Sequence, residues 1–352
     1  MAPRIAFFGT PEFAVPALAG LARAGHELLV VTQPARPQGR GLMAAASPIA
    51  SQASALGLPL IERRTLRGTG DLDPMRDFAP DLLVVVAFGL ILHRPLLELP
   101  RLGAVNLHPS LLPRHRGVAP IPWTLLAGDP MTGVATIRMD EGIDTGDLLG
   151  VVAVEVAPEE NAIELGARLA QLGAELVVDT VDALVRETAV PRPQPSLGAT
   201  YAPRLAKVHG HLEWTRPAEF LARQVRAMAG WPGARVGLDT EVMEIQTARA
   251  LAGESAAEAP GRVMAVDPAG IQVATGSGRL LLTRVQAAGK RPLAAVDFAR
   301  GRRLRPGACF ASLPGADLLP RLVEEVFHGD GGWPGRSRAG AAGAREGESH
   351  GG

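Results

Sequence analysis

Hydrophobic residues come in short, nearly continuous runs along the first third of the chain. RIAFFG (4–9), ELLVVT (27–32) and DLLVVVAFGLIL (81–92) hold few polar positions, and such runs predict strands that are buried on both faces. Strands of this kind are typical of a parallel sheet covered by helices on both sides. Residues 9–27 read as a turn that opens a helix, which completes a βαβ unit. The pattern therefore predicts an α/β domain built on a Rossmann-like open parallel sheet.

The segment GAVNLH (103–108) continues this pattern as a further strand and ends in polar side chains. Asn106 and His108 are two positions apart, so on a strand their side chains share one face. Ligands of open α/β sheets bind beyond the carboxyl ends of the strands. We therefore expect chemistry at the end of this strand, just before the turn SLLP (110–113).

The hydrophobic pattern changes again in the second half of the chain. Residues 133–156 read as a β-rich excursion with Gly-Asp turns, and residues 161–188 repeat apolar positions at helical spacing. The proline-rich stretch AVPRPQPSLGATYAPR (189–204) lacks periodicity, which is typical of a semi-rigid linker. Beyond it, alternating apolar and polar runs with Gly and Asp-Pro turns predict a small β-barrel.

These changes divide the chain into four parts. Residues 1–188 are predicted to form the α/β domain and 189–205 the linker. Residues 206–315 are predicted to form a smaller C-terminal, OB-like β-barrel domain. Residues 316–352 are expected to be a disordered tail, because the sequence beyond Phe327 is glycine-rich and has almost no core-forming residues.

Composition narrows the class of protein. The chain is 47% hydrophobic and 20% charged, which fits a globular fold, and its 36 basic and 36 acidic residues argue against a uniformly basic nucleic-acid binder. Cys309 is the only cysteine, so an internal disulfide and a cysteine-rich zinc site are excluded. No segment has the length and apolarity of a membrane span, and we expect a cytoplasmic protein.

The charges are distributed unevenly. Residues 140–187 carry twelve Asp or Glu against two Arg, whereas residues 279–305 carry eight basic residues against one acidic residue, Asp297. The two halves of the chain are therefore expected to face different partners. The eight basic residues are Arg279, Arg284, Lys290, Arg291, Arg300, Arg302, Arg303 and Arg305.

Asn106 and His108 fit two interpretations. They could be a turn cap and a strand-end histidine with satisfied hydrogen bonds, or part of a catalytic site. The buried strand before them and Asp144 in the loop GIDTGD favour catalysis. An amide can donate to a developing oxyanion, an imidazole can exchange a proton near neutral pH, and a carboxylate can hold the imidazole tautomer. Spacing leaves open whether Asp144, Asp140 or Asp147 approaches the histidine.

A series of motifs follows in order between about residues 4 and 311. They are FFGTPEFAVPAL, TQPARPQGRG, SPIA, VVVAFGLIL, NLHPSLLPRHRGVAPI, TGVATIRMDEGIDTGDLL, TYAPRLAK, WPGA and GIQVATGSG. Together they resemble the methionyl-tRNA formyltransferase family. The Asn-x-His-x-Ser-Leu-Leu-Pro stretch with its later Asp is specific for folate-dependent formyltransferases as a class, and FGTPEF with QPxRPxGRG narrows the choice to this family.

The resemblance implies a reaction and its site. Formyl would pass from 10-formyltetrahydrofolate to the α-amino group of methionyl-initiator tRNA, which serves translation initiation. Asn106, His108 and Asp144, called the trio below, would be the catalytic residues. The folate would contact Phe88, Gly89, Ser110, Leu111, Leu112 and Pro113. No metal is expected, because His93, His108 and His115 lack ligand spacing and read as solvated or singly functional residues.

The tRNA contacts are also implied by resemblance. The loop TQPARPQGRG would reach the acceptor end through Arg36 and Arg40, although Leu42, Met43 and three alanines stand where the family often has lysines. The basic set of the second domain would contact the tRNA backbone, chiefly through Lys290, Arg291, Arg302 and Arg303. A solvated surface is the plain alternative for these charges. The protein is expected to act as a monomer, away from membranes.

Two other classes of protein function remain open. A folate-dependent formyltransferase with a small acceptor, such as an amino sugar or a purine precursor, would keep the trio but leave the basic β-domain and the QPxRPxGRG loop without a purpose. A non-catalytic RNA-binding protein on a degenerate enzyme fold is opposed by the intact trio. The product formed from charged initiator tRNA would separate the three.

Overall fold

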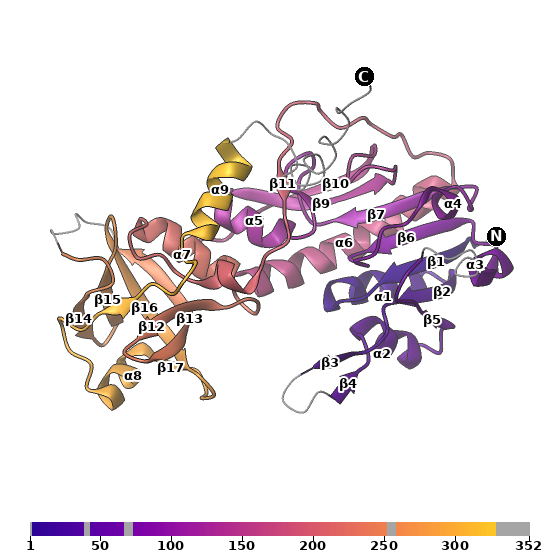
Figure 1. The fold of residues 1–352 in the computed structure, drawn as a ribbon. Coiled ribbons are helices and arrows are strands. Elements are labelled where there is room, and N and C mark those ends of the chain that lie inside the picture. Colours follow the sequence, from indigo (N-terminus) through magenta and orange to yellow (C-terminus); the bar gives the residue numbers. More distant parts are fainter. Residues whose placement is uncertain (1, 39–42, 67–72, 252–257, 329–352) are drawn as a thin grey trace, which may run out of the picture.

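Figure 1 shows two domains joined by an extended segment in a computed structural model of the chain. The structure describes residues 2–38, 43–66, 73–251 and 258–328. The end of the predicted tail, from residue 329 on, lies outside the described residues. Within the described ranges, no helix combines the length and apolarity needed to cross a membrane.

The first domain is built on a seven-stranded sheet with the order β10-β9-β7-β6-β1-β2-β5. Its strands are β1 (Arg4–Gly9), β2 (Glu27–Thr32), β5 (Leu60–Glu62), β6 (Leu82–Val86), β7 (Ala104–His108), β9 (Met131–Arg138) and β10 (Leu148–Glu155). From β7 to β5 the neighbours pair in parallel, with Val85 opposite Asn106. The predicted open α/β sheet is confirmed, and the wholly apolar β6 lies at its centre.

One edge of the sheet departs from parallel pairing. β9 runs antiparallel to β7, and β10 runs antiparallel to β9. A hydrophobic pattern reports burial rather than strand direction, so the sequence predicted these strands without their orientation. The loop between them, residues 139–147, folds back over the face of β7 that carries Asn106 and His108.

Alternate residues of β1 pack on opposite faces of the sheet. Ile5 and Phe7 belong to the larger core, whereas Ala6 and Phe8 belong to a smaller core on the other face. Helices α1 (Val15–Arg23), α2 (Pro48–Ala55), α5 (Pro120–Ala127) and α6 (Ala162–Val185) contribute to the larger core, and α3 (Asp73–Phe78) and α4 (Arg94–Leu97) to the smaller one. The sheet is thus covered on both sides, as its continuous apolar strands require.

Helix α6 is the long helix predicted from the apolar spacing of residues 161–188. It begins after Asn161, whose side chain accepts hydrogen bonds from the backbone N–H groups of Ile163 and Glu164. The Glu164 side chain in turn accepts a hydrogen bond from the backbone N–H of Asn161, which completes a capping box. The helix runs beneath β9 and β10 and supports the edge of the sheet beside the site.

The second domain is an antiparallel, strongly curved sheet with the order β14-β15-β16-β13-β12-β18. Its strands are β12 (Ala234–Leu238), β13 (Glu241–Leu251), β14 (Val263–Asp267), β15 (Gly270–Ala274), β16 (Arg279–Ala287), β17 (Leu293–Ala294) and β18 (Phe310–Ala311). A bridge between Arg262 and Cys309 joins the two ends of this order, so the sheet nearly closes on itself. Helices α7 (Ala218–Ala227) and α8 (Ala295–Arg302) pack on it. The predicted OB-like barrel is confirmed.

The proline-rich segment between the domains lies against the first domain (Figure 1). Its strand β11 (Tyr201–Ala202) pairs in parallel with β8 (Arg116–Gly117). Trp123 on α5 donates a hydrogen bond from Nε1 to the carbonyl of Pro203, at 2.8 Å. The segment was predicted to be a semi-rigid linker from composition alone, and composition gave no indication of these contacts.

The first part of the predicted disordered tail is a helix. α9 (Leu318–His328) packs against α5 and against the short helix η3 (Lys207–Gly210) of the second domain, as Figure 1 shows. Leu319 is fully buried, and the ring of Phe327 packs edge-on against the ring of Trp123 at 5.8 Å. The disorder prediction is wrong for this segment because its apolar residues recur at helical spacing and find a surface to cover.

Candidate active site

The two polar side chains at the end of β7 lie on one face of the strand, as their spacing predicted. His108 is 3% exposed and Asn106 is half-buried. Leu107 between them faces the opposite core, where it packs against Gly173 of α6. The strand is therefore held from behind, while its polar face is directed toward the loop that carries Asp144.

Asp144 contacts both other members of the trio. Its Oδ1 accepts a hydrogen bond from Asn106 Nδ2 at 3.0 Å, and its Oδ2 lies 3.5 Å from His108 Nδ1. The backbone N–H of Gly117 also donates to Oδ2, at 2.8 Å. Asp140, one of the alternatives, instead binds Thr145 within its own loop. The structure thus brings Asp144 to His108.

The second ring nitrogen of His108 determines where a proton can go. Nε2 lies 2.9 Å from the carbonyl oxygen of His115. A carbonyl oxygen only accepts, so Nε2 carries a hydrogen, and Nδ1 of the neutral ring is an acceptor that faces Asp144. A proton taken up at Nδ1 would therefore sit between the imidazole and a carboxylate oxygen.

The turn after β7 is tightly packed. Ser110 is fully buried and donates from Oγ to the carbonyl of Arg114 at 2.6 Å. Leu112, before the cis-proline Pro113, is buried against Ala135 and Ile137. Of the predicted folate contacts in this turn, only Leu111 and Pro113 keep partly exposed side chains.

His115 was expected to be solvated or singly functional, but it is buried behind the trio. It is 2% exposed, its Nε2 donates to Asp129 Oδ2 at 2.7 Å, and its carbonyl holds His108. Burial lowers the pKa of His115, and the hydrogen bond to Asp129 does not compensate. Burial alone would raise the pKa of Asp129, but hydrogen bonds from His115 and Arg114 outweigh it, and that pKa lies below its usual value. A lone histidine in a sequence carries no signal of such burial.

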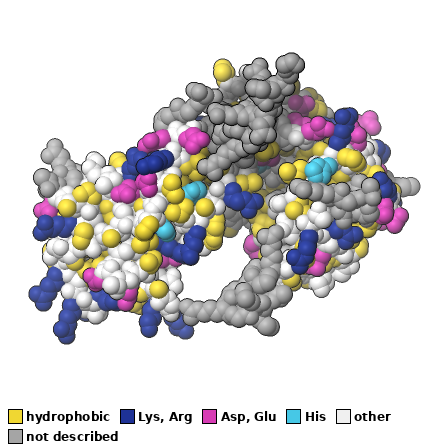
Figure 2. Space-filling model, in the orientation of Figure 1, with side chains coloured by type: hydrophobic (Ala, Val, Ile, Leu, Met, Phe, Trp, Pro, Cys, Tyr) yellow, Lys and Arg dark blue, Asp and Glu magenta, His cyan; other side chains and the backbone are white. Residues whose placement is uncertain are grey.

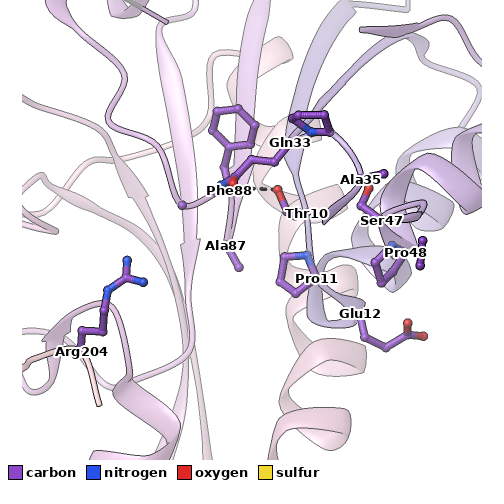
Figure 3. Close-up of a pocket in the computed structure, with 13 residues that line it drawn as sticks. Thr10, Pro11, Glu12, Gln33, Ala35, Ser47, Pro48, Ala87, Phe88 and Arg204 are labelled. Atoms are coloured by element: carbon purple, nitrogen blue, oxygen red, sulfur yellow. Dashed lines mark hydrogen bonds between the residues drawn. The ribbon is translucent and has the colours of Figure 1, made fainter. Parts of the chain in front are cut away.

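A pocket of about 410 Å³ opens at the carboxyl ends of β1, β2 and β6, beside the end of β7 (Figure 3). Its lining residues are Thr10, Pro11, Glu12, Gln33, Pro34, Ala35, Ala45, Ser47, Pro48, Ala87, Phe88, Gly89 and Arg204. Phe88 and Gly89, which were predicted to contact the folate, line this pocket, and the sequence pattern did not single out the polar residues across from them. Arg204 reaches the pocket from the end of the proline-rich segment between the domains, on the side opposite Glu12.

Phe88 shapes this pocket through its backbone. Its ring is 2% exposed and packs edge-on against Phe8, with 5.3 Å between the ring centroids. Its carbonyl accepts hydrogen bonds from Thr10 Oγ1 at 3.1 Å, drawn in Figure 3, and from Gln33 Nε2 at 2.7 Å. The backbone of residues 87–89 is thus a fixed wall next to the trio.

The predicted tRNA-contacting residues are spread over both domains. Arg36 lies on β3 (Arg36–Gln38), which pairs with β4 (Met43–Ala45), and Arg40 lies outside the described residues. Lys290, Arg291 and Arg303 are exposed on the second domain. Figure 2 shows Lys and Arg side chains projecting along the lower rim of that domain.

Arg302, another of the predicted tRNA-contacting residues, already has partners within the chain. Its guanidinium pairs with Glu241 and lies 5.8 Å from the centroid of the Phe298 ring. A contact with tRNA would have to compete with this ion pair. Among the described residues, no cluster of His, Cys, Asp or Glu is arranged to hold a metal ion.

Two family models match most of the chain. The formyl transferase model matches residues 3–181, and the formyl transferase C-terminal domain model matches residues 204–303. Methionyl-tRNA formyltransferase from Halorhodospira halophila is 47% identical over 87% of this chain and 99% of its own length. The enzyme of that name from Myxococcus xanthus is 44% identical over 87% of this chain and 97% of its own length. The chain belongs to the methionyl-tRNA formyltransferase family.

Solved structures agree with this family at the level of the fold. A methionyl-tRNA formyltransferase from Clostridium thermocellum superimposes with a TM-score of 0.51 at 16% identity, covering 72% of this chain and 95% of that one. HypX from Aquifex aeolicus in complex with tetrahydrofolic acid gives a TM-score of 0.57 at 15% identity over 85% of this chain. This chain spans about half of HypX, covering 47% of its length.

Proposed function

We propose that the protein transfers a formyl group from 10-formyltetrahydrofolate to the α-amino group of methionyl-initiator tRNA. The observation that carries the proposal is the trio at the carboxyl end of β7, in a chain 44% to 47% identical to methionyl-tRNA formyltransferases. Such a product serves translation initiation, which places the enzyme in the cytoplasm, where it acts as a monomer on one charged tRNA.

Asn106 is proposed to stabilise the oxyanion. When the uncharged amine attacks the formyl carbon, the carbonyl oxygen gains negative charge and needs a fixed hydrogen-bond donor. The amide nitrogen of Asn106 has two N–H groups, and Asp144 holds one of them. The second N–H is left to donate to the oxyanion, from a side chain that Asp144 has already oriented.

His108 is proposed to carry the proton. The attacking nitrogen becomes positively charged as its bond to the formyl carbon forms, and it must lose a proton before the bond from that carbon to folate N10 breaks. His108 Nδ1 can accept this proton, because it faces Asp144 and because the carbonyl of His115 already binds the other ring nitrogen, Nε2. The proton then passes to the departing N10, so no covalent enzyme intermediate is needed.

The pocket beside the trio is proposed to receive the aminoacyl end of the acceptor. Its polar groups, which include Glu12, Ser47 and Arg204, suit a terminal nucleoside and its phosphate better than an apolar ligand. Residues 87–89 line this pocket, whereas the predicted folate contacts Leu111 and Pro113, which keep exposed surface, are not among its lining residues. The formyl carbon would then lie between donor and acceptor, at the trio.

The basic rim of the second domain is proposed to bind the tRNA backbone. Lys290, Arg291 and Arg303 are exposed, and backbone contacts from such residues are salt-sensitive and largely independent of sequence. A small-acceptor formyltransferase would have no use for this rim, and a non-catalytic RNA-binding protein would have no use for the trio.

One experiment tests the proposal directly. The protein is incubated with 10-formyltetrahydrofolate and methionyl-initiator tRNA, and the aminoacyl group is released and analysed for N-formylmethionine. A parallel reaction offers free methionine and an amino sugar as small acceptors. We expect formylation of the tRNA-bound methionine alone. Formylation of a small acceptor in its place, or of none of them, would contradict the proposed function.

A further inference from the structure

Gln194 reaches the catalytic loop from the segment between the two domains. Its Nε2 donates hydrogen bonds to the backbone carbonyls of Asp144 and Gly146, each at 2.8 Å. These two contacts join residues that are 50 and 48 positions apart in the chain. The side chain is half-buried, so its polar groups are directed inward rather than toward solvent.

Arg116 fixes the orientation of the Gln194 amide. Its Nε and Nη2 donate to Gln194 Oε1 at 3.1 and 2.7 Å. A guanidinium has no acceptor, so the amide oxygen faces Arg116 and the amide nitrogen faces the loop. Arg116 belongs to β8, and the next residue, Gly117, donates its backbone N–H to the Asp144 carboxylate. Asp144 is therefore held at its backbone carbonyl by one segment and at its carboxylate by another.

The backbone of Asp144 explains why such support matters. Its φ angle is 52°, in the left-handed region that disfavours residues with a Cβ. A residue in this conformation persists where its surroundings hold it. Thr145 also braces the loop by donating to Asp140, but that bond lies within the loop and does not tie it to the rest of the domain. Gln194 ties the backbone of the loop, at Asp144 and Gly146, to the segment between the domains.

We propose that Gln194 is a positioning residue, which holds Asp144 in the geometry that serves Asn106 and His108. This inference rests on the proposed function, because it assigns Asp144 a part in the reaction. The segment between the domains is then part of the catalytic site rather than a tether. Gln194 need not touch a substrate, because it acts through the 3.0 Å and 3.5 Å contacts that Asp144 makes with Asn106 and His108.

The test uses the full-length protein and three variants. Gln194→Met keeps the side-chain length and removes both donors. Gln194→Glu keeps the pairing with Arg116 and places an oxygen against the two carbonyls. Gln286→Met is the matched control, because Gln286 Nε2 also donates to a backbone carbonyl, that of Lys290, in the second domain. Turnover, KM for methionyl-tRNA and thermal stability are measured for each.

We expect both Gln194 variants to lose turnover by roughly tenfold or more, as a displaced proton-transfer group would, while KM changes less than about twofold. The control should keep the wild-type turnover per folded molecule. A purely structural role would lower stability and the amount of active enzyme, whereas a positioning role changes turnover per folded molecule. Gln194 variants with wild-type turnover per folded molecule would overturn the inference.

A double-mutant cycle with Asp144→Asn separates this inference from the proposed function. If Gln194 acts through Asp144, then adding Gln194→Met to Asp144→Asn lowers turnover by less than about twofold beyond the single Asp144→Asn variant. Full multiplication of the two losses would contradict positioning through Asp144. Near-normal turnover of Asp144→Asn itself would overturn the proposed function instead, whatever Gln194 does.

Discussion

At the scale of single residues, the site depends on polar side chains whose hydrogen-bonding groups are oriented by fixed partners. His108 has a carbonyl on one nitrogen and a carboxylate near the other, and Asn106 has one of its two N–H groups bound to that carboxylate. The buried His115 stands behind this arrangement and contributes the carbonyl. Burial lowers the pKa of His115, so the folded protein is most stable when this ring is neutral.

This burial predicts how stability depends on pH. As pH falls below about 6.5, the unfolded chain binds a proton at His115 before the folded protein does, so the free energy of unfolding decreases. Burial lowers the pKa values of His26 and His209 as well, and they act in the same direction. Urea unfolding between about pH 7 and pH 5 should therefore show falling stability, with a smaller slope in His115→Gln. An unchanged slope in that variant would contradict the assigned burial effect.

At the scale of elements, the edge strands β9 and β10 are packed too closely for an added side chain. A Cβ on Gly133 would lie 2.1 Å from the backbone oxygen of Val152 and 2.7 Å from Leu111 Cδ2. Leu111 belongs to the turn after β7, so the strand pair and the site share this contact. Glycine is required here by close approach rather than by backbone conformation.

We predict that Gly133→Ala destabilises the protein by about 1–3 kcal/mol, the usual range for overpacking, because the backbone of β10 must move. The matched control is Gly301→Ala on α8, where a Cβ would meet no atom within 4 Å. That control should be neutral or stabilising by up to about 1 kcal/mol, since alanine favours a helix over glycine. Chemical denaturation compares the two, and equal effects would refute the packing argument.

At the scale of the whole molecule, α9 connects the two domains. Phe327 packs against Trp123 of the first domain, and Glu324 forms an ion pair with Arg216 of the second at 3.0 Å. This helix lies beyond residue 303, where the match to the C-terminal domain model ends. Its contacts bury apolar surface between the domains, which should stabilise their arrangement.

Phe327→Ala is predicted to lower the free energy of unfolding by about 1–3 kcal/mol, less than for a fully buried phenylalanine because the side chain is only partly covered. Arg321→Ala serves as the control. Its exposed ion pair with Asp317 should be worth no more than about 0.5 kcal/mol. Thermal unfolding of the full chain measures both, and a control that loses as much stability as Phe327→Ala would contradict the proposed docking.

The basic rim gives a prediction about salt. Replacing Lys290 and Arg291 with alanine should weaken tRNA binding and reduce the slope of log affinity against log salt by roughly two, about one for each phosphate contact. Arg23 and Arg64, both exposed on the first domain, provide a charge-matched double control. A slope that changes equally in the two double variants would mean that the rim contributes only bulk charge.

Sequence patterns correctly predicted the features of this molecule that depend on local residue spacing. The apolar runs gave β6 and β7, and the two-residue spacing placed Asn106 and His108 on one face. They could not choose Asp144 over its neighbours, because that depends on how a loop 38 residues away folds back. Gln194 carried no signal, since a glutamine in a proline-rich segment looks solvated until its partners are known. Helix α9 did have a sequence signal, because Leu319, Leu322 and Val326 recur at helical spacing.

The central claim is that Asn106 and His108 perform formyl transfer to methionyl-initiator tRNA. The most direct measurement is single-turnover formation of N-formylmethionyl-tRNA by Asn106→Ala and His108→Ala, with tRNA binding followed separately. We predict a loss of roughly a hundredfold or more in each variant, the scale for removing an oxyanion donor or a proton-transfer group, while tRNA affinity and folding stay close to those of the wild type. Near-normal formylation by both variants would contradict the account.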